Sequence, residues 1–356
     1  MLSKLDQAKT ALDVVIRKSR VHLYKPIQIA EILYHHRTSS EKKIILSDLE
    51  TYRARSKKWR DLICMQFLGR ASTSSAKFQD NLFEENAIPS RLLSILGEEN
   101  VKYNGIVEAY IYSAFESKHL QLEKALSYCL KRDRETFELK EFLNQFWSEP
   151  GLKRSLDKIF EIVVYSLFEV LTRAMDVKID IYYDQSKLDI LNEFEEFAEK
   201  ILNLNADNNK ATLDAHFHRV GVTNAADRGL DMYANFGSVV QIKHLSLDEE
   251  LAQNVVTSIT SERIIIICKS VEKNTINSLL SQIGWRSRIQ AIITIDDLID
   301  WYHRALKGKY AYLIGEQVIN TLSEEIKNEF PSVGSTDFQN FKKDRGYNIL
   351  VSDYWK

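Results

Sequence analysis

The segment from Asp227 to His244, Asp-Arg-Gly-Leu-Asp-Met-Tyr-Ala-Asn-Phe-Gly-Ser-Val-Val-Gln-Ile-Lys-His, contains two β-prone runs with a turn signal between them. The first run is Leu230 to Ala234 and the second is Ser238 to His244. Asn235-Phe236-Gly237 separates them, and an Asn/Gly turn between two such runs predicts a hairpin.

Three polar residues of this hairpin suit phosphodiester hydrolysis. Side chains alternate along a strand, so Gln241 and Lys243 are expected on one face, close to Asp231 of the preceding run. The reaction needs a hard cation held by oxygen ligands and a positive group that positions or activates water. We therefore expect Asp231 to ligate a metal, Gln241 to supply an oxygen ligand or orient water, and Lys243 to act on the water.

The same spacing also has a structural explanation. An Asp followed ten residues later by Gln-x-Lys occurs in proteins of many functions, and Lys243 would then simply end a strand in solvent. The flanking elements favour the catalytic interpretation because they follow a recognisable order. The expected elements are a helix over 188–202, a strand over 213–222, the hairpin, a helix over 251–261, a strand over 263–268, a helix over 276–283, a strand over 289–294 and a helix from 296.

This order and the acid preceding a Gln-x-Lys resemble the PD-(D/E)xK nuclease superfamily. The resemblance implies an α+β fold, with a central mixed sheet flanked by helices. Gln241 departs from the pattern, because the superfamily usually has Glu or Asp at that place. Another carboxylate is then needed for the metal, and the candidates are Glu195, Glu199 and Asp227.

Three longer segments resemble the HaeII-type restriction endonucleases: Arg219 to Asp231, Val240 to His244 and Leu23 to Leu33. The resemblance implies Mg²⁺-dependent cleavage of double-stranded DNA at a short specific sequence. It also implies a partner DNA methyltransferase that protects the cell's own DNA. Cleavage of both strands of a twofold-symmetric site is most simply done by a homodimer.

The charge distribution suggests where DNA would bind. The whole chain carries −2, but its first 60 residues contain 14 Lys and Arg against 6 Asp and Glu. A basic cluster there includes Arg53, Arg55, Lys57, Lys58 and Arg60, interleaved with aromatic residues. Such a cluster either contacts phosphates or forms an ordinary solvated helix face.

The loop before the hairpin offers further DNA contacts. Thr223, Asn224 and Arg228 lie there, and Arg and Asn form bidentate contacts with guanine and adenine edges. In a purely structural role, Asn224 would cap a turn and Arg228 would pair with a neighbouring acid.

Composition and patterning set the limits of the architecture. Apolar helical spacing over residues 1–180 predicts a large helical N-terminal domain for DNA recognition or dimerisation, followed by a catalytic core over 181–310 and a C-terminal helix and tail over 311–356. No apolar run is long enough for a membrane span, and the acid-containing start is unlike a secretory signal, so we expect a cytoplasmic protein. The three cysteines are widely spaced, which argues against structural zinc.

Two other functions fit the same sequence. A DNA-binding regulatory protein would use the helical half and tolerate loss of Asp231 and Lys243. A repair or junction-resolving nuclease of the same superfamily would recognise DNA structure instead of sequence. The size of the helical N-terminal half favours sequence recognition.

Overall fold

The computed structural model describes residues 3–19, 22–39, 44–72, 75–148, 152, 155–220, 230–242, 261, 263–268, 288–330, 335–349 and 352–355. The helices are α1 (Lys4–Lys18), α2 (Tyr24–Thr38), α3 (Arg53–Leu68), α4 (Ala76–Asp80), α5 (Ser90–Lys102), α6 (Ile106–Leu130), α7 (Leu139–Trp147), α8 (Leu156–Ala174), α9 (Leu188–Glu193), α10 (Glu195–Phe197), α13 (Ile295–Lys307), α14 (Ala311–Glu329) and α15 (Ser335–Asp344). The strands are β1 (Lys178–Tyr182), β2 (Lys210–Asp214), β3 (Phe217–Arg219), β4 (Met232–Ala234), β5 (Ser238–Ile242), β6 (Arg263–Cys268) and β7 (Ile289–Thr294).

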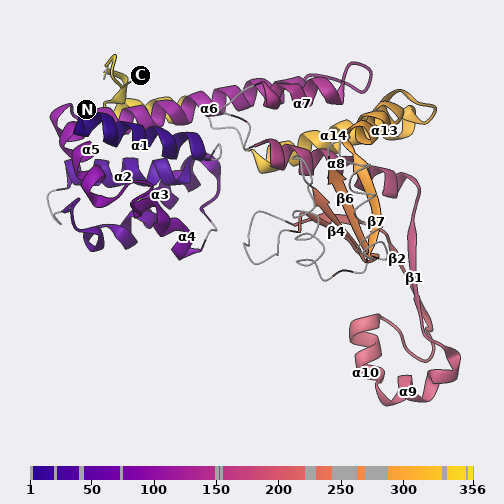
Figure 1. Cartoon of the computed structure of the whole chain (residues 1–356). Coiled ribbons are helices and arrows are strands. Elements are labelled where there is room, and N and C mark those ends of the chain that lie inside the picture. Colours follow the sequence, from indigo (N-terminus) through magenta and orange to yellow (C-terminus); the bar gives the residue numbers. More distant parts are fainter. Residues whose placement is uncertain are drawn as a thin grey trace, which may run out of the picture.

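The described part of the chain has two hydrophobic cores (Figure 1). The N-terminal core is formed by α1, α2, α3, α5 and the first half of α6. The second core lies between the five-stranded sheet and the helices α8, α13 and α14, and includes the second half of α6. The 25-residue helix α6 therefore connects the two cores by contributing side chains to both.

The larger sheet is mixed, with strand order β3-β4-β5-β6-β7. Strands β3, β4 and β5 are antiparallel neighbours, whereas β5, β6 and β7 run parallel. The predicted hairpin is confirmed as β4 and β5, and Gly237 in its turn has a φ of 96°, a conformation that glycine adopts without strain. The predicted strand over 263–268 is also confirmed, and its isoleucines from Ile264 to Ile267 are buried. An α+β fold with a mixed sheet flanked by helices is thus confirmed.

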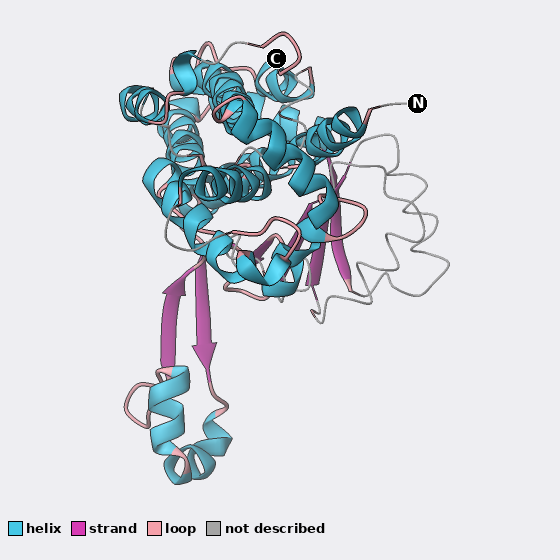
Figure 2. Cartoon of the chain, turned by 90° about the vertical axis from the view of Figure 1, so that its left-hand side faces the viewer, coloured by secondary structure: helices cyan, strands magenta, loops and turns pink. Residues whose placement is uncertain are grey.

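The prediction of a core helix over 188–202 is wrong, because this segment is not one continuous helix and does not lie in either core. Its residues form α9, α10 and a π-helical turn over Ala198–Leu202, at the tip of a hairpin made by β1 and β2. Figures 1 and 2 show this hairpin projecting away from both cores. The apolar spacing that predicted the helix is real, but Phe194 and Phe197 are each 56% exposed, so the pattern does not face a core. Among the described elements, α8, which precedes this segment, packs on the sheet in the second core.

The predicted strand over 213–222 is divided. Its first residues belong to β2 of the projecting hairpin and its middle residues form β3 of the main sheet. The break falls at Ala215 and His216, where the chain passes from one sheet to the other. The predicted helices over 251–261 and 276–283 lie outside the described residues, except for Ser261.

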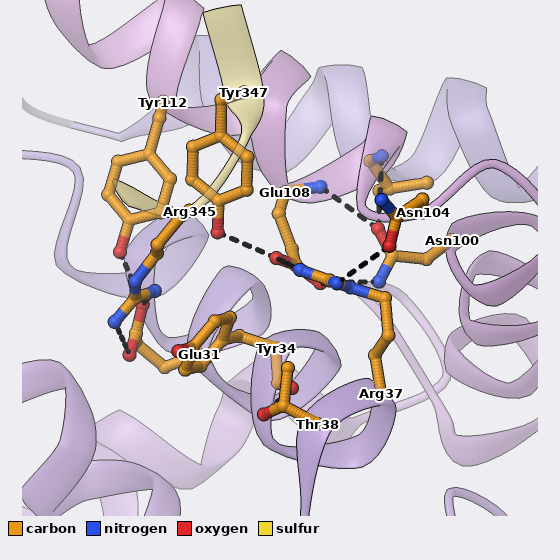
Figure 3. A network of polar contacts seen from close by, with 11 residues as sticks. Glu31, Tyr34, Arg37, Thr38, Asn100, Asn104, Glu108, Tyr112, Arg345 and Tyr347 are labelled. Carbon is orange, nitrogen blue, oxygen red and sulfur yellow. Dashed lines mark hydrogen bonds and ion pairs between the residues drawn. The ribbon is translucent and has the colours of Figure 1, made fainter. Parts of the chain in front are cut away.

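The C-terminal segment returns to the N-terminal core. Phe338, Phe341, Tyr347 and Trp355 pack there, whereas α14 packs on α8 in the other core. A buried polar network holds this segment (Figure 3). The segment from 311 to 356 is therefore shared between the two cores, and α8, which we placed in the N-terminal region, belongs with the sheet.

In that network, Arg345 forms an ion pair with Glu31 of α2, with 2.6 Å between Nη1 and Oε1, and Tyr112 donates a hydrogen bond to the same carboxylate at 2.5 Å. Tyr347 donates to Glu108 at 2.6 Å, and Arg37 forms a bidentate contact with Glu108. Both carboxylates are buried, so the network satisfies charges that would otherwise be costly.

Candidate active site and nucleic-acid interface

Asp231 and Gln241 are in direct contact. The amide nitrogen of Gln241 donates a hydrogen bond of 2.6 Å to Oδ2 of Asp231, and the backbone N–H of Ile242 donates to the same oxygen at 2.7 Å. Asp231 directly precedes β4, and Gln241 lies on the adjacent β5, so the antiparallel pairing of these strands brings the two residues together. The hairpin thus positions the pair as the sequence predicted.

A second carboxylate, which the sequence did not indicate, lies close to this pair. Glu161 of α8 is 5% exposed, and burial raises its pKa to about 7. The cation of Lys158, with Nζ 2.5 Å from Oε2 of Glu161, opposes that rise, and the negative charge of Asp231 adds to it. Glu161 precedes Asp231 by 70 residues, and only the packing of α8 on the sheet brings them together.

The other candidate acids are elsewhere or outside the described residues. Glu195 is exposed on α10 and Glu199 lies in the adjacent π-helical turn, both at the tip of the projecting hairpin (Figure 1). The structure therefore does not bring Glu195 to Asp231, because the expected core helix is not in the core. Asp227 and the expected catalytic Lys243 lie outside the described residues, although Lys243 directly follows the last residue of β5.

The described donors suit a hard divalent cation. Asp231 and Glu161 offer carboxylate oxygens and Gln241 an amide oxygen, the donor types that Mg²⁺ prefers. Burial raises the pKa of Glu161 and the negative charge of Asp231 adds to that rise, so a bound cation would favour the charged form of Glu161. Within the described ranges, no three His, Cys, Asp or Glu side chains form a metal-binding group by themselves. The site would thus need its amide or a further ligand.

The basic cluster of α3 divides into surface and internal residues. Arg60 is 1% exposed, pairs with Asp61 at 2.7 Å and donates to Gln28, so it is inaccessible to DNA. Arg53 and Lys57 both pair with Asp80, at 2.9 and 2.7 Å.

The two remaining members of the cluster are closer to the surface. Lys58 is exposed and Arg55 is half-buried. The guanidinium of Arg55 lies 5.4 Å from the centre of the Trp59 ring. Thr223, Asn224 and Arg228 lie outside the described residues.

Comparison with known proteins identifies the family. The model of the HaeII restriction endonuclease family matches residues 8–347. The chain belongs to the HaeII restriction endonuclease family. It is 56% identical over 347 residues to the type II restriction enzyme HaeII of Haemophilus aegyptius, and 54% identical over 349 residues to the type II restriction enzyme NgoBI of Neisseria gonorrhoeae. Each alignment covers 98% of both chains. No solved structure matches this chain.

Membership of the HaeII family confirms the resemblance drawn from the sequence. The match extends over both hydrophobic cores, so the helical N-terminal half is part of the family's common architecture. Among the described helices, none has the length and apolar character needed to cross a membrane.

In this HaeII-family chain, an arginine links the site to the rest of the protein. Arg219, the last residue of β3, pairs with Glu325 at 2.5 Å and Glu329 at 3.2 Å, both on α14. The positive charge of Arg219 also lowers the pKa of Glu161, which places Arg219 near that carboxylate. Arg70 donates to the backbone oxygen of Glu329 from the end of the N-terminal core. Ion pairs thus run from the helical half to the edge strand β3, whose Arg219 is paired with Met232, the residue after Asp231.

Proposed function

We propose that this chain hydrolyses both strands of DNA at a short specific sequence, using Mg²⁺ held near Asp231. Membership of the HaeII family makes it a type II restriction endonuclease, a site-specific deoxyribonuclease. The observation that carries the placement of the site is the contact of Asp231 with Gln241 beside the buried Glu161. Gln241 comes from β5, Asp231 directly precedes β4, and Glu161 of α8 is near enough for the charge of Asp231 to raise its pKa.

Each residue has a role in the proposed reaction. Asp231 and Glu161 would hold the cation, and Gln241 would supply its amide oxygen or orient a water. Lys243 would position or activate the attacking water and offset charge on the phosphate. When bound, the cation would add positive charge next to the scissile phosphate. Arg219 would keep the end of β3 and the two carboxylates in place.

The surroundings of the site support a DNA substrate and a twofold assembly. The exposed Lys58 and the half-buried Arg55 of α3 would contact phosphates, together with Arg53 and Lys57 at the margin of the cluster. Thr223, Asn224 and Arg228 would read bases or hold phosphates next to the hairpin. We further propose a homodimer that acts in the cytoplasm, with a DNA methyltransferase as its functional partner.

The test is cleavage of a long unmethylated DNA by the full-length protein, with Mg²⁺ and with EDTA. Discrete fragments that require Mg²⁺ are expected, and their ends would give the recognition sequence. Asp231→Ala, Glu161→Gln and Lys243→Ala are each expected to abolish cleavage while retaining DNA binding in Ca²⁺ or EDTA. An uncleaved DNA that is bound in a salt-sensitive manner would instead favour a non-catalytic DNA-binding protein.

A matched control separates loss of chemistry from loss of folding. Glu316→Gln changes an exposed acid of α14 that pairs with Arg134 and not with Arg219 or the proposed metal ligands. It should keep metal-dependent cleavage to within about tenfold. Full cleavage by Asp231→Ala would remove Asp231 from the site. Cleavage of branched DNA in preference to linear duplex would favour a structure-specific nuclease.

A further inference from the structure

The projecting hairpin, residues 176–214 and hereafter called the arm, has an apolar patch at its tip. The patch consists of four tip side chains that are 56–67% exposed: Ile190, Phe194, Phe197 and Ile201. Figures 1 and 2 show from two directions that the tip lies away from both hydrophobic cores. Large exposed apolar side chains concentrated on one small element are typical of interaction sites.

The strands that carry the tip are also solvated on both sides. In β1 no residue is buried, and in β2 only Ala211 is. An isolated two-stranded ribbon is marginally stable in water. Ion pairs hold it together, between Lys178 and Asp214 at 2.5 Å and between Lys210 and Asp180 at 2.9 Å. The arm is thus built to hold its tip at a distance from its own chain, which points to a partner.

The charge of the arm argues against DNA as that partner. Residues 176–214 contain 10 Asp and Glu but only 4 Lys, a net charge of −6. Three of the lysines pair with acids of the arm itself. A segment of this charge is repelled by phosphates. Because the whole chain carries −2, the remainder of the chain carries +4, opposite in sign to the arm.

We propose that the arm is the dimerisation element, and that its tip docks on the body of a second copy of this chain. The choice of a second copy rests on the proposed function, since cutting both strands of a twofold site favours a symmetric dimer. Opposite charges attract the arm of one copy to the body of the other, and the same charges prevent two acidic arms from docking on each other. The resulting interface is isologous, because the arm of each copy contacts the body of the other copy.

The size of the patch fits such an interface. A large apolar side chain has roughly 150 to 200 Å² of surface, and the four patch side chains are 56–67% exposed. Each tip therefore offers on the order of 400 Å². Two docked tips and the two surfaces that receive them would bury about 1,600 Å² in total, a typical area for a stable complex.

The first experiment measures the mass of the full chain in solution by light scattering, without DNA. The wild-type protein is expected to have twice the 41.3 kDa chain mass, and Phe194→Asp/Phe197→Asp to have the single-chain mass. Tyr182→Asp on β1 is the matched control, because Tyr182 is 75% exposed on the arm but lies outside the patch. It should remain dimeric. A monomeric wild type, or a double variant that remains dimeric, would overturn the proposal.

A second variant covers the case in which the aspartates disturb the arm. Tyr182 and Lys210 are directly paired in the hairpin, so residues 183–209 can be replaced by Asn-Gly, a two-residue turn that suits such a pair. This shortened protein keeps β1 and β2 and is expected to be monomeric, with the circular dichroism of a folded chain. A dimer in this variant would contradict the proposal.

Cross-linking identifies what the tip contacts. The cysteines Cys64, Cys129 and Cys268 are buried, so a photo-activated cross-linker on Asn192→Cys would react from the tip alone. We expect cross-links to the body of a second copy, with or without DNA. Cross-links to another arm or to DNA would contradict the proposal. DNA cleavage by the wild type is measured separately. A wild-type dimer that does not cleave DNA would contradict the proposed function. A wild type that cleaves DNA, together with a dimeric tip variant, would contradict only the role of the arm.

Discussion

Gln241 donates its amide hydrogen bond to Asp231 with 2.6 Å between Nε2 and Oδ2. Gln241 is 2% exposed and Asp231 is partly buried, so the amide side of the pair is shielded from water. The amide of Gln241 donates a hydrogen bond to the carboxylate of Asp231, whereas a carboxylate at position 241 would repel it. Glutamine at position 241 therefore has a structural effect, because its hydrogen bond joins β5 to Asp231.

The change Gln241→Glu tests this relationship. Without metal, two carboxylates at this distance repel, so the variant should be destabilised by about 1–3 kcal/mol. Mg²⁺ should restore its stability, and the rise in melting temperature with Mg²⁺ should exceed that of the wild type. Melting curves over a series of Mg²⁺ concentrations measure both effects. A loss of stability that Mg²⁺ does not reverse would show that residue 241 is not a ligand.

Glu161 makes the stability of the metal-free protein depend on pH. Its pKa of about 7 in the folded protein is above the ordinary value of 4.5. Between these values the folded state binds more protons than the unfolded state, so the contribution of this group to stability falls as pH rises from about 4.5 to about 7. We expect Glu161→Gln to be more stable than the wild type at pH 8, by on the order of 1–3 kcal/mol, and to lack this pH dependence.

The same variant separates catalysis from folding. Glu161→Gln should be more stable at pH 8 and yet inactive, a combination that loss of folding cannot produce. Denaturant titrations at pH 5 and pH 8, together with the cleavage test, measure it. Retained cleavage would exclude Glu161 as a metal ligand. A variant that is less stable at pH 8 would show that the Lys158 ion pair outweighs the burial of the carboxylate.

The ion pair between Arg345 and Glu31 should be needed for the N-terminal core. Arg345→Met leaves the buried carboxylate of Glu31 with Tyr112 as its remaining described partner. We expect a loss of about 3–5 kcal/mol, because an uncompensated buried charge is costly. Chemical denaturation measures it. The double change Arg345→Met/Glu31→Gln removes both charges and should recover part of the loss, and no recovery would mean that packing of the arginine dominates.

Lys58 and Arg55 should contribute to DNA affinity through phosphates. Lys58→Ala and Arg55→Ala are each expected to weaken binding equally for specific and nonspecific DNA, and to lower the slope of log affinity against log salt by about 1. Arg91→Ala is the control, since Arg91 is exposed on α5 and outside this cluster. Binding titrations at several salt concentrations measure the slopes. Unchanged slopes in both variants would show that this face of α3 does not contact DNA.

The sequence by itself determined the local geometry of the site. Strand alternation and an Asn/Gly turn depend on neighbouring residues, so the β4–β5 hairpin and the approach of Gln241 to Asp231 followed from the order of residues. The buried isoleucine strand β6 was predictable for the same reason, because a continuous β-branched run needs two covered faces.

The tertiary structure alone decided which distant residues join that geometry. Glu161 reaches the site because α8 packs on the sheet, and the apolar spacing over 188–202 could not show that its residues lie on an exposed arm. Likewise, the buried Arg60 and the exposed Lys58 belong to one basic run, and only the packing of α3 separates them. Periodicity shows that a segment has an apolar face, but what covers that face depends on contacts between residues far apart in the chain.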